Sequence, residues 1–293
     1  MRTGDEYVLK SGRRVAVRTV VDGTGDLTVV ICHPAPGSSA FDPEPEQTFA
    51  RGVTLLSVDR PGYGGSEPMP DDQWTSVSCA ADDLAQVLDD RQTGPVGLAG
   101  WSAGGRVAMA LAAHRPDLVE RLAVIATPAP DEEVPWVPPE QRAALEALRG
   151  RPPGEVYAEL ADQLRPLLPA DPHAPRSLAA LGAGPADAEA LSGGGRDRLG
   201  RMLAAAYAQG VTGLAADIAG YCLQPWGFEP AGVQTKTLLL YGSQDPVAGS
   251  RHGRWWQQHL PDARLEMVPG AGHLLMIPLW KRVLSHLAPH CKR

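Results

Sequence analysis

Short apolar runs that alternate with helical segments are the feature that most limits how this chain can fold. Each run ends near a turn that contains Gly or Pro, as expected of strands buried on both faces of a sheet. The runs are Leu27–His33, Val53–Val58, Pro95–Ala99, Leu122–Ala126, Thr237–Tyr241 and Arg264–Val268. The helical patterns are Trp74–Leu88, Ala103–His114, Ser250–His259 and Leu275–Leu287. This alternation predicts an α/β fold with a mostly parallel, doubly wound sheet covered on both faces.

The pattern changes after Thr127. Residues 128–235 hold 14 of the 28 prolines and show no buried strand run. They carry 8 Arg and no Lys against 14 Asp and Glu, so most of the formal net charge of -7 lies there. Their helical stretches are Pro139–Leu148, Glu155–Leu168, Arg196–Gln209 and Leu214–Leu223. We therefore expect a core made of residues 1–127 and 236–293, with residues 128–235 inserted as an α-helical cap, or lid.

A serine lies at the junction between a predicted strand and a predicted helix. Gly100-Trp101-Ser102-Ala103-Gly104 matches the G-x-S-x-G pattern of a nucleophile elbow, a sharp turn that lifts the serine hydroxyl above the sheet edge. Side chains two positions from the serine would collide with neighbouring elements, so glycine suits both positions. The pattern predicts Ser102 as a nucleophile.

The chain also supplies a base and an acid in suitable places. A serine hydroxyl needs a base to activate it, and the base needs an acid to orient it. His273 follows the Arg264–Val268 run in a Gly-rich loop, and Asp245 follows the Thr237–Tyr241 run. Asp131 is a rival acid, because it lies shortly after another predicted strand. We expect Asp245 to be the acid and His273 to be the base.

The loop after the first buried run contains two prolines that restrict its hydrogen bonding. An acyl-transfer intermediate needs backbone N–H donors aimed at its negative oxygen, and proline has no N–H. In His33-Pro34-Ala35-Pro36-Gly37, this leaves Ala35 as the natural donor between the prolines. Ala103, directly after the serine at the start of its helix, is the expected second donor. His33 is expected to brace the loop through hydrogen bonds.

Five motifs in this order resemble the α/β-hydrolase superfamily over residues 1–127 and 236–293. They are His33-Pro34-Ala35-Pro36-Gly37-Ser38, Asp59-Arg60-Pro61-Gly62-Tyr63-Gly64-Gly65-Ser66, Gly100–Gly105, Gly242–Asp245 and Gly270–His273. The order Ser102, Asp245, His273 is the order of the catalytic triad in that superfamily. The chain departs from the family at His33-Pro34, where the usual pair is His-Gly. Members with an aspartate nucleophile have a different chemistry, which Ser102 excludes.

The resemblance implies a serine hydrolase that needs no cofactor and no metal. Its substrate would be an ester, lactone, thioester or small amide, cleaved through an acyl-enzyme on Ser102. The same triad also serves acyltransferases, lyases and cyclases, which stay as alternatives. A non-catalytic ligand receptor on this scaffold is a further alternative, disfavoured by the complete Ser102, Asp245 and His273 set. Among the aromatic residues, Trp101 and Trp226 are candidates for substrate contact.

Composition excludes several other classes of protein. A net charge of -7 and a pI near 5.6 argue against nucleic-acid binding. Four scattered cysteines without a CxxC pair predict neither a zinc site nor a disulfide scaffold. There is neither an apolar signal core nor a membrane-spanning run. We therefore expect a cytoplasmic protein, monomeric or homodimeric, whose partner is a small acyl substrate.

Overall fold

The computed structural model, which describes residues 4–25 and 27–289, is built around an eight-stranded sheet. The strands are β1 (Asp5–Val8), β2 (Arg14–Val21), β3 (Thr28–Cys32), β4 (Thr54–Val58), β5 (Val96–Trp101), β6 (Val119–Ile125), β7 (Thr237–Gly242) and β8 (Ala263–Val268). Their order is β1-β2-β4-β3-β5-β6-β7-β8. Strands β3 to β8 are mutually parallel, whereas β1 and β2 pair antiparallel. The predicted mostly parallel sheet is confirmed.

Alternate side chains of each central strand enter different apolar layers. In β3, Val30 joins the cluster that contains helices α2 (Val77–Arg91), α3 (Ala103–His114) and α9 (Ser250–His259). Ile31 joins the opposite cluster, which contains α10 (Trp280–Leu287). Helix α1 (Pro45–Arg51) packs beside α10 on that face. Because successive strand residues point to opposite faces, a continuous apolar run supplies both layers.

Two helices begin later than the sequence pattern predicts. Helix α2 begins at Val77, because the Ser76 hydroxyl accepts the Cys79 N–H at 3.0 Å and caps the helix. Helix α10 begins at Trp280 and not at Leu275, because Pro278 cannot donate a helical hydrogen bond and restrains the residue before it. The short helix α1 was not predicted at all.

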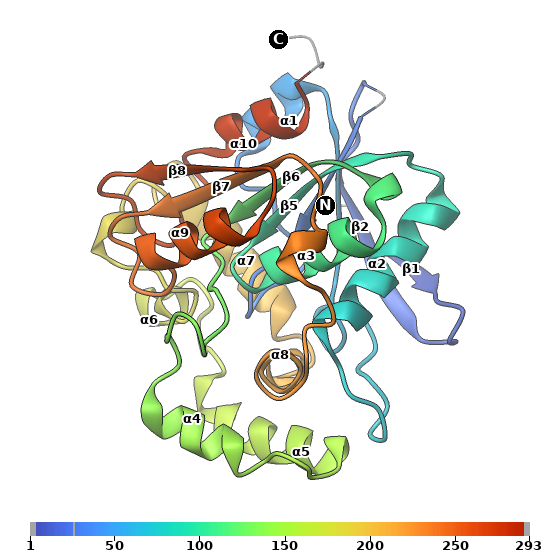
Figure 1. Ribbon diagram of the computed structural model, residues 1–293, viewed down its shortest axis with the longest axis vertical. Coiled ribbons are helices and arrows are strands. Elements are labelled where there is room, and N and C mark those ends of the chain that lie inside the picture. Colours follow the sequence, from blue (N-terminus) through green and yellow to red (C-terminus); the bar gives the residue numbers. More distant parts are fainter. Residues whose placement is uncertain (1–3, 26, 290–293) are drawn as a thin grey trace.

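The described residues between β6 and β7 form helices and loops, without a strand. The helices are α4 (Pro139–Glu146), α5 (Pro153–Leu164), α6 (Pro175–Ala179), α7 (Gly195–Ala206) and α8 (Thr212–Cys222). Three of them begin with a proline, which is favoured at the first helical position. Figure 1 shows α4 and α5 at the end of the molecule farthest from the sheet, with α8 between them and the core.

The two ends of this inserted segment meet around one buried arginine. Arg106 lies on α3, and its guanidinium carbon is 4.5 Å from the ring centre of Trp226, 5.2 Å from Trp136 and 5.4 Å from Tyr221. Trp226 also stacks on Trp256 of α9 at 6.2 Å between ring centres. Cation–π contacts of this kind, away from water, stabilise the junction between the segment and the core.

Candidate active site

Ser102 occupies a sharp turn between β5 and α3. Its backbone has φ 53° and ψ -121°, a conformation that costs a residue with a side chain about 1–3 kcal/mol. The two flanking glycines make the turn possible. A Cβ on Gly100 would overlap the backbone of Gly105, and one on Gly104 would overlap the carbonyl oxygen of Cys32. The serine is therefore held at the carboxyl end of β5, with 9% of its surface exposed.

His273 and Asp245 meet at the ends of the neighbouring strands β8 and β7. The His273 Nδ1 and Asp245 Oδ2 atoms are 2.8 Å apart, and both side chains are buried. The N–H groups of Val247 and Ala248 also donate to Asp245 Oδ1. Burial would raise the pKa of Asp245, but the hydrogen bond and charge of His273, with these two N–H groups, bring it below its usual value. Asp245 is therefore a carboxylate at neutral pH.

The residue before the serine contacts His273 directly. Trp101 packs on the His273 ring at 6.1 Å between ring centres, and its indole N–H donates to the His273 carbonyl at 3.1 Å. Among the described residues, no hydrogen bond links the Ser102 hydroxyl to the imidazole. Such contacts commonly tighten only when substrate binds. Trp101 is completely buried, so the structure gives it a packing contact and not the exposed face expected of a substrate-binding residue.

Asp131, the rival acid, is engaged elsewhere. Its Oδ1 atom accepts the N–H groups of Trp136 and Val137 at 2.7 Å, and Arg142 pairs with its Oδ2 atom. These contacts organise the loop that leads into α4. The structure therefore joins His273 to Asp245, and it does not join His273 to Asp131.

The two expected oxyanion donors lie at the ends of neighbouring strands. Ala103 is the first residue of α3, and Ala35 follows β3 in a loop that contains a cis Ala35–Pro36 bond. The backbone N–H of Arg60 donates to His33 Nε2 at 3.2 Å, so the ring proton is on Nδ1. That Nδ1–H donates to the Pro34 carbonyl at 2.9 Å. His33 thus braces the loop after β3 through hydrogen bonds, as the sequence predicts, and links it to the turn after β4.

Trp226, the other candidate for substrate contact, lies in the cluster around Arg106. Its indole N–H donates to the Tyr221 carbonyl at 3.0 Å, and its ring stacks on Phe228. One edge of this cluster lines a cavity of about 860 Å³ between the two ends of the inserted segment. Neither Ser102 nor His273 lines that cavity, so the structure does not bring Trp226 to the candidate nucleophile.

Several residues near the site were not singled out as functional by the sequence patterns. Asp187 of the inserted segment is 2% exposed and accepts the Leu274 N–H at 2.8 Å, next to His273. Gly182 has φ +80° and lies so close to His273 that a Cβ there would be 2.9 Å from the ring. Asp217 pairs with Arg60 in the interior. Asp217 is the only charged residue of the otherwise apolar α8, and this isolation was the signal that could have identified it.

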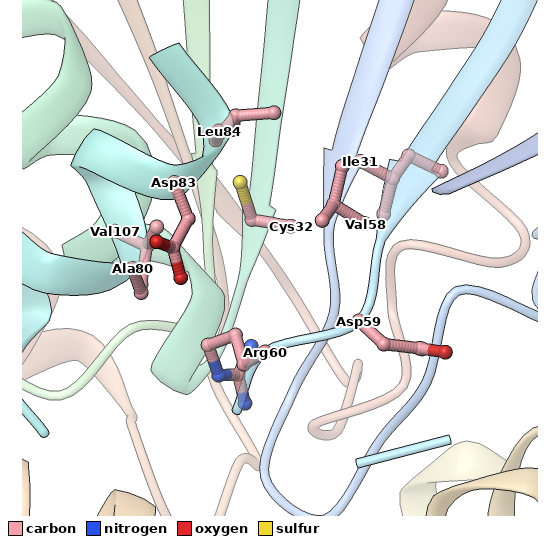
Figure 2. A pocket seen from close by; sticks show the side chains of 9 residues that line it. All are labelled: Ile31, Cys32, Val58, Asp59, Arg60, Ala80, Asp83, Leu84 and Val107. Carbon is pink, nitrogen blue, oxygen red and sulfur yellow. The ribbon is translucent and has the colours of Figure 1, made fainter. Parts of the chain in front are cut away.

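The turn after β4 separates two charged side chains. Figure 2 shows Asp59 and Arg60 leaving this turn in different directions around a small cavity of about 20 Å³. Asp59 accepts the N–H groups of Ser39 and Gly65 and so fixes the turn itself. Arg60 is directed toward α8 and the loop after β3. The turn is therefore part of the framework around the candidate site.

The described residues contain no group of three or more His, Cys, Asp or Glu side chains that could hold a metal ion. In that same part of the chain, no helix is long and apolar enough to cross a membrane. Cys32, Cys79 and Cys222 are free thiols, and Cys291 lies outside the described residues. Burial raises the pKa of the Cys32 thiol to about 12, so it is not a nucleophile at neutral pH.

Residues 28–278 match the alpha/beta hydrolase fold family, so the chain belongs to this family. It is 30% identical over 235 residues to a pimeloyl-[acyl-carrier protein] methyl ester esterase from Chromobacterium violaceum, which covers 80% of this chain and 82% of the relative. The esterase of the same name from Nitrosomonas europaea is 27% identical, covering 86% and 90%.

The solved structures agree with this assignment at the level of the fold. An esterase from Exiguobacterium antarcticum superposes with a TM-score of 0.72 at 16% identity, covering 99% of this chain and 100% of that one. With the family and the two relatives, this identifies an esterase-type α/β hydrolase.

Proposed function

We propose that this protein hydrolyses a carboxylic ester through an acyl-enzyme formed on Ser102. The buried contact of 2.8 Å between His273 and Asp245 carries the proposal, because it fixes the imidazole beside the elbow that holds the serine. The ionised Asp245 accepts the Nδ1–H of His273, which leaves Nε2 as the basic atom. A base oriented in this way is what a serine hydroxyl needs to become a nucleophile.

The reaction would have two halves with one intermediate. Ser102 Oγ forms a bond to the carbonyl carbon while His273 Nε2 takes its proton. The bond from that carbon to the alcohol oxygen then breaks, and His273 gives the proton to the leaving alcohol. Water attacks the acyl-enzyme with His273 again as the base, which releases the acid and restores the Ser102 hydroxyl. In each half, the N–H groups of Ala35 and Ala103 would stabilise the negative oxygen.

Residues 128–235 would act as the cap of this site and favour an apolar acyl group. Leu178, Leu181 and Met202 of the segment belong to the same apolar cluster as Phe41 and Trp101 of the core. This shared cluster holds the segment against the core by removing apolar surface from water. The two relatives are named for a pimeloyl-[acyl-carrier protein] methyl ester, a methyl ester with a long acyl part. A methyl ester with an extended acyl chain is therefore the first substrate to test.

The test combines labelling of the serine with turnover of esters. A fluorophosphonate should label the wild-type protein once, on Ser102, and the Ser102→Ala variant should be neither labelled nor active. Ser192→Ala is the matched control, because Ser192 is an exposed serine of the inserted segment. Turnover is measured with p-nitrophenyl esters of increasing chain length and with methyl esters of the same acids. A folded protein that is not labelled, or that keeps its turnover without Ser102, would show that the proposed mechanism is wrong.

A further inference from the structure

A buried ion pair that the proposed reaction does not use connects the inserted segment to the core. Arg60 follows β4, and Asp217 lies in the middle of α8. Their side chains are 5% and 6% exposed, and the Arg60 NH2 nitrogen is 2.6 Å from Asp217 Oδ2. The Arg60 Nε–H also donates to Asp217 at 3.1 Å. Burial alone would lower the pKa of Arg60, but the charge of Asp217 raises it, so the guanidinium stays charged.

The other edge of the same guanidinium contacts the loop after β3. The NH2 group of Arg60 donates to the Pro34 carbonyl at 2.8 Å, and its NH1 group donates to the His33 carbonyl. Tyr63 packs against both Arg60 and His33. Its ring centre is 5.3 Å from the guanidinium carbon of Arg60 and 5.1 Å from the ring centre of His33. The Pro34 carbonyl therefore accepts two hydrogen bonds, one from Arg60 and one from His33.

These contacts determine the direction of one particular N–H group. The Pro34 carbonyl belongs to the same planar peptide group as the Ala35 N–H. Among the described residues, only the next bond, Ala35–Pro36, is cis. In the trans Pro34–Ala35 peptide the carbonyl and the N–H point in opposite directions. Donors that hold the carbonyl on one side consequently aim the Ala35 N–H to the other side. A charged donor on a carbonyl also polarises the peptide and strengthens its N–H as a donor.

We propose that Arg60 is a positioning residue for the oxyanion donor Ala35, and that Asp217 makes this positioning depend on the docking of helix α8. The inference rests on the proposed function, because it assigns a support to one of the proposed donors. It gives the inserted segment a part in catalysis beyond covering the substrate. A segment that docks poorly would leave Arg60 without its partner and the Ala35 N–H without a fixed direction.

Arg60→Lys is the sharpest variant. Lysine keeps the positive charge, but its single ammonium cannot bond Asp217 and both carbonyls in the geometry of a guanidinium. Loss of one oxyanion donor costs about 10²–10³ in kcat, so misdirection of one should lower kcat by about 10-fold to 100-fold. KM should change little, because the oxyanion forms only in the transition state. Binding of a trifluoromethyl ketone, whose adduct with Ser102 carries the oxyanion, should weaken by the same factor as kcat.

Asp217→Asn is the second variant, and it keeps the proposal testable if Arg60→Lys does not fold. Asparagine has the same shape and still accepts one hydrogen bond, so a smaller fall in kcat of the same kind is expected. The control is Arg198→Lys. Arg198 of α7 pairs with Glu44 at 3.1 Å and also joins the segment to the core, but none of its hydrogen bonds goes to residues 33–37. Its kcat should equal that of the wild type.

The outcomes separate this inference from the proposed function. If the wild type hydrolyses esters and is labelled on Ser102, the proposed function holds whatever the variants do. If folded Arg60→Lys and Asp217→Asn then keep the wild-type kcat, the positioning role is wrong. It is also wrong if kcat falls together with a shift in the acidic limb of the pH–rate profile, since that limb reports on the imidazole side of the site. If Arg198→Lys lowers kcat as well, and by the same factor, the effect comes from docking of the segment alone and the positioning role is wrong.

Discussion

The two halves of the proposed site are held in different ways. The acid–base half, His273 and Asp245, comes from the ends of the adjacent strands β8 and β7 and is joined by one direct hydrogen bond. The oxyanion half, residues 33–37, is held by Arg60, whose partner Asp217 is 157 positions further along the chain. The acid–base pair is joined by core residues, and the inserted segment reaches it only from the side, through Asp187 and Gly182. A half that is braced through α8 depends also on how the inserted segment docks.

The largest expected effect concerns the acid of the first half. Asp245→Asn should lower kcat by about 10⁴-fold, because an amide no longer holds the imidazole in the correct tautomer or stabilises its charged form. Asp131→Asn is the matched control, since Asp131 organises the loop before α4 and does not contact His273. Steady-state kinetics on a p-nitrophenyl ester measures both variants. A larger loss in Asp131→Asn would make Asp131 the acid. An equal loss in the two variants would contradict the assignment to Asp245.

A smaller effect tests whether the inserted segment also touches the acid–base half. Gly182 of the segment lies against the His273 ring, and a Cβ there would be 2.9 Å from the ring and from Val247. Gly182→Ala should therefore displace the imidazole and lower kcat by about tenfold. Its positive φ should also cost about 1 kcal/mol of stability.

Gly210→Ala separates these two consequences. Gly210 lies in the same segment with φ +69°, but a Cβ there would meet nothing within 4 Å. It should lose similar stability in thermal unfolding and keep its kcat. If both variants lose the same activity, the contact between Gly182 and His273 has no role, and the contrast between the two halves becomes sharper.

The smallest expected effect is on stability in acid. The His252 ring of α9 accepts the Ala129 N–H at 3.1 Å, and burial is the main cause that lowers the pKa of His252 to about 4. An unfolded histidine titrates near 6.5, so between about pH 6.5 and 4 the unfolded chain binds a proton that the folded state does not. The free energy of unfolding should therefore fall as the pH is lowered through this window, by at most about 3 kcal/mol.

His252→Asn removes the titrating group and keeps an acceptor for the Ala129 N–H. Urea unfolding at several pH values should show a smaller loss in the variant than in the wild type, with kcat at neutral pH unchanged. Identical losses in the two proteins would mean that His252 takes no part in the acid sensitivity. His252 is 6% exposed, so its titration is coupled to the folded state.

The contrast between the halves matches what could be predicted from the sequence. Strand runs such as Leu122–Ala126 are strongly apolar, and the loops that follow parallel strands meet at one sheet edge. That rule alone brings Ser102, Asp245 and His273 to the same end of the sheet. The G-x-S-x-G pattern then specifies the elbow, since only glycine fits the backbone contacts on both sides.

The remaining features depend on packing between distant segments, which no local pattern contains. Arg60 stood in the sequence only as part of the Asp59–Ser66 motif, because its partner is on a helix whose docking the sequence does not specify. The short helices α1 and α6 have too few turns to show a periodic pattern. Trp101 was expected near substrate because it adjoins the serine, yet a residue on a buried strand points into the core.

The cluster around Arg106 gives the protein an optical signal of its own. Four of the seven tryptophans belong to this cluster or adjoin it: Trp136 and Trp226 contact Arg106, Trp256 stacks on Trp226, and Trp255 meets Trp256 edge-on. The first two are on the inserted segment, whereas Arg106 and the other two are on the core. Indole emission responds to a nearby cation and to stacking, so separation of the two parts would change the intrinsic fluorescence. The docking of the inserted segment on the core can thus be followed during turnover by intrinsic fluorescence, without an attached dye.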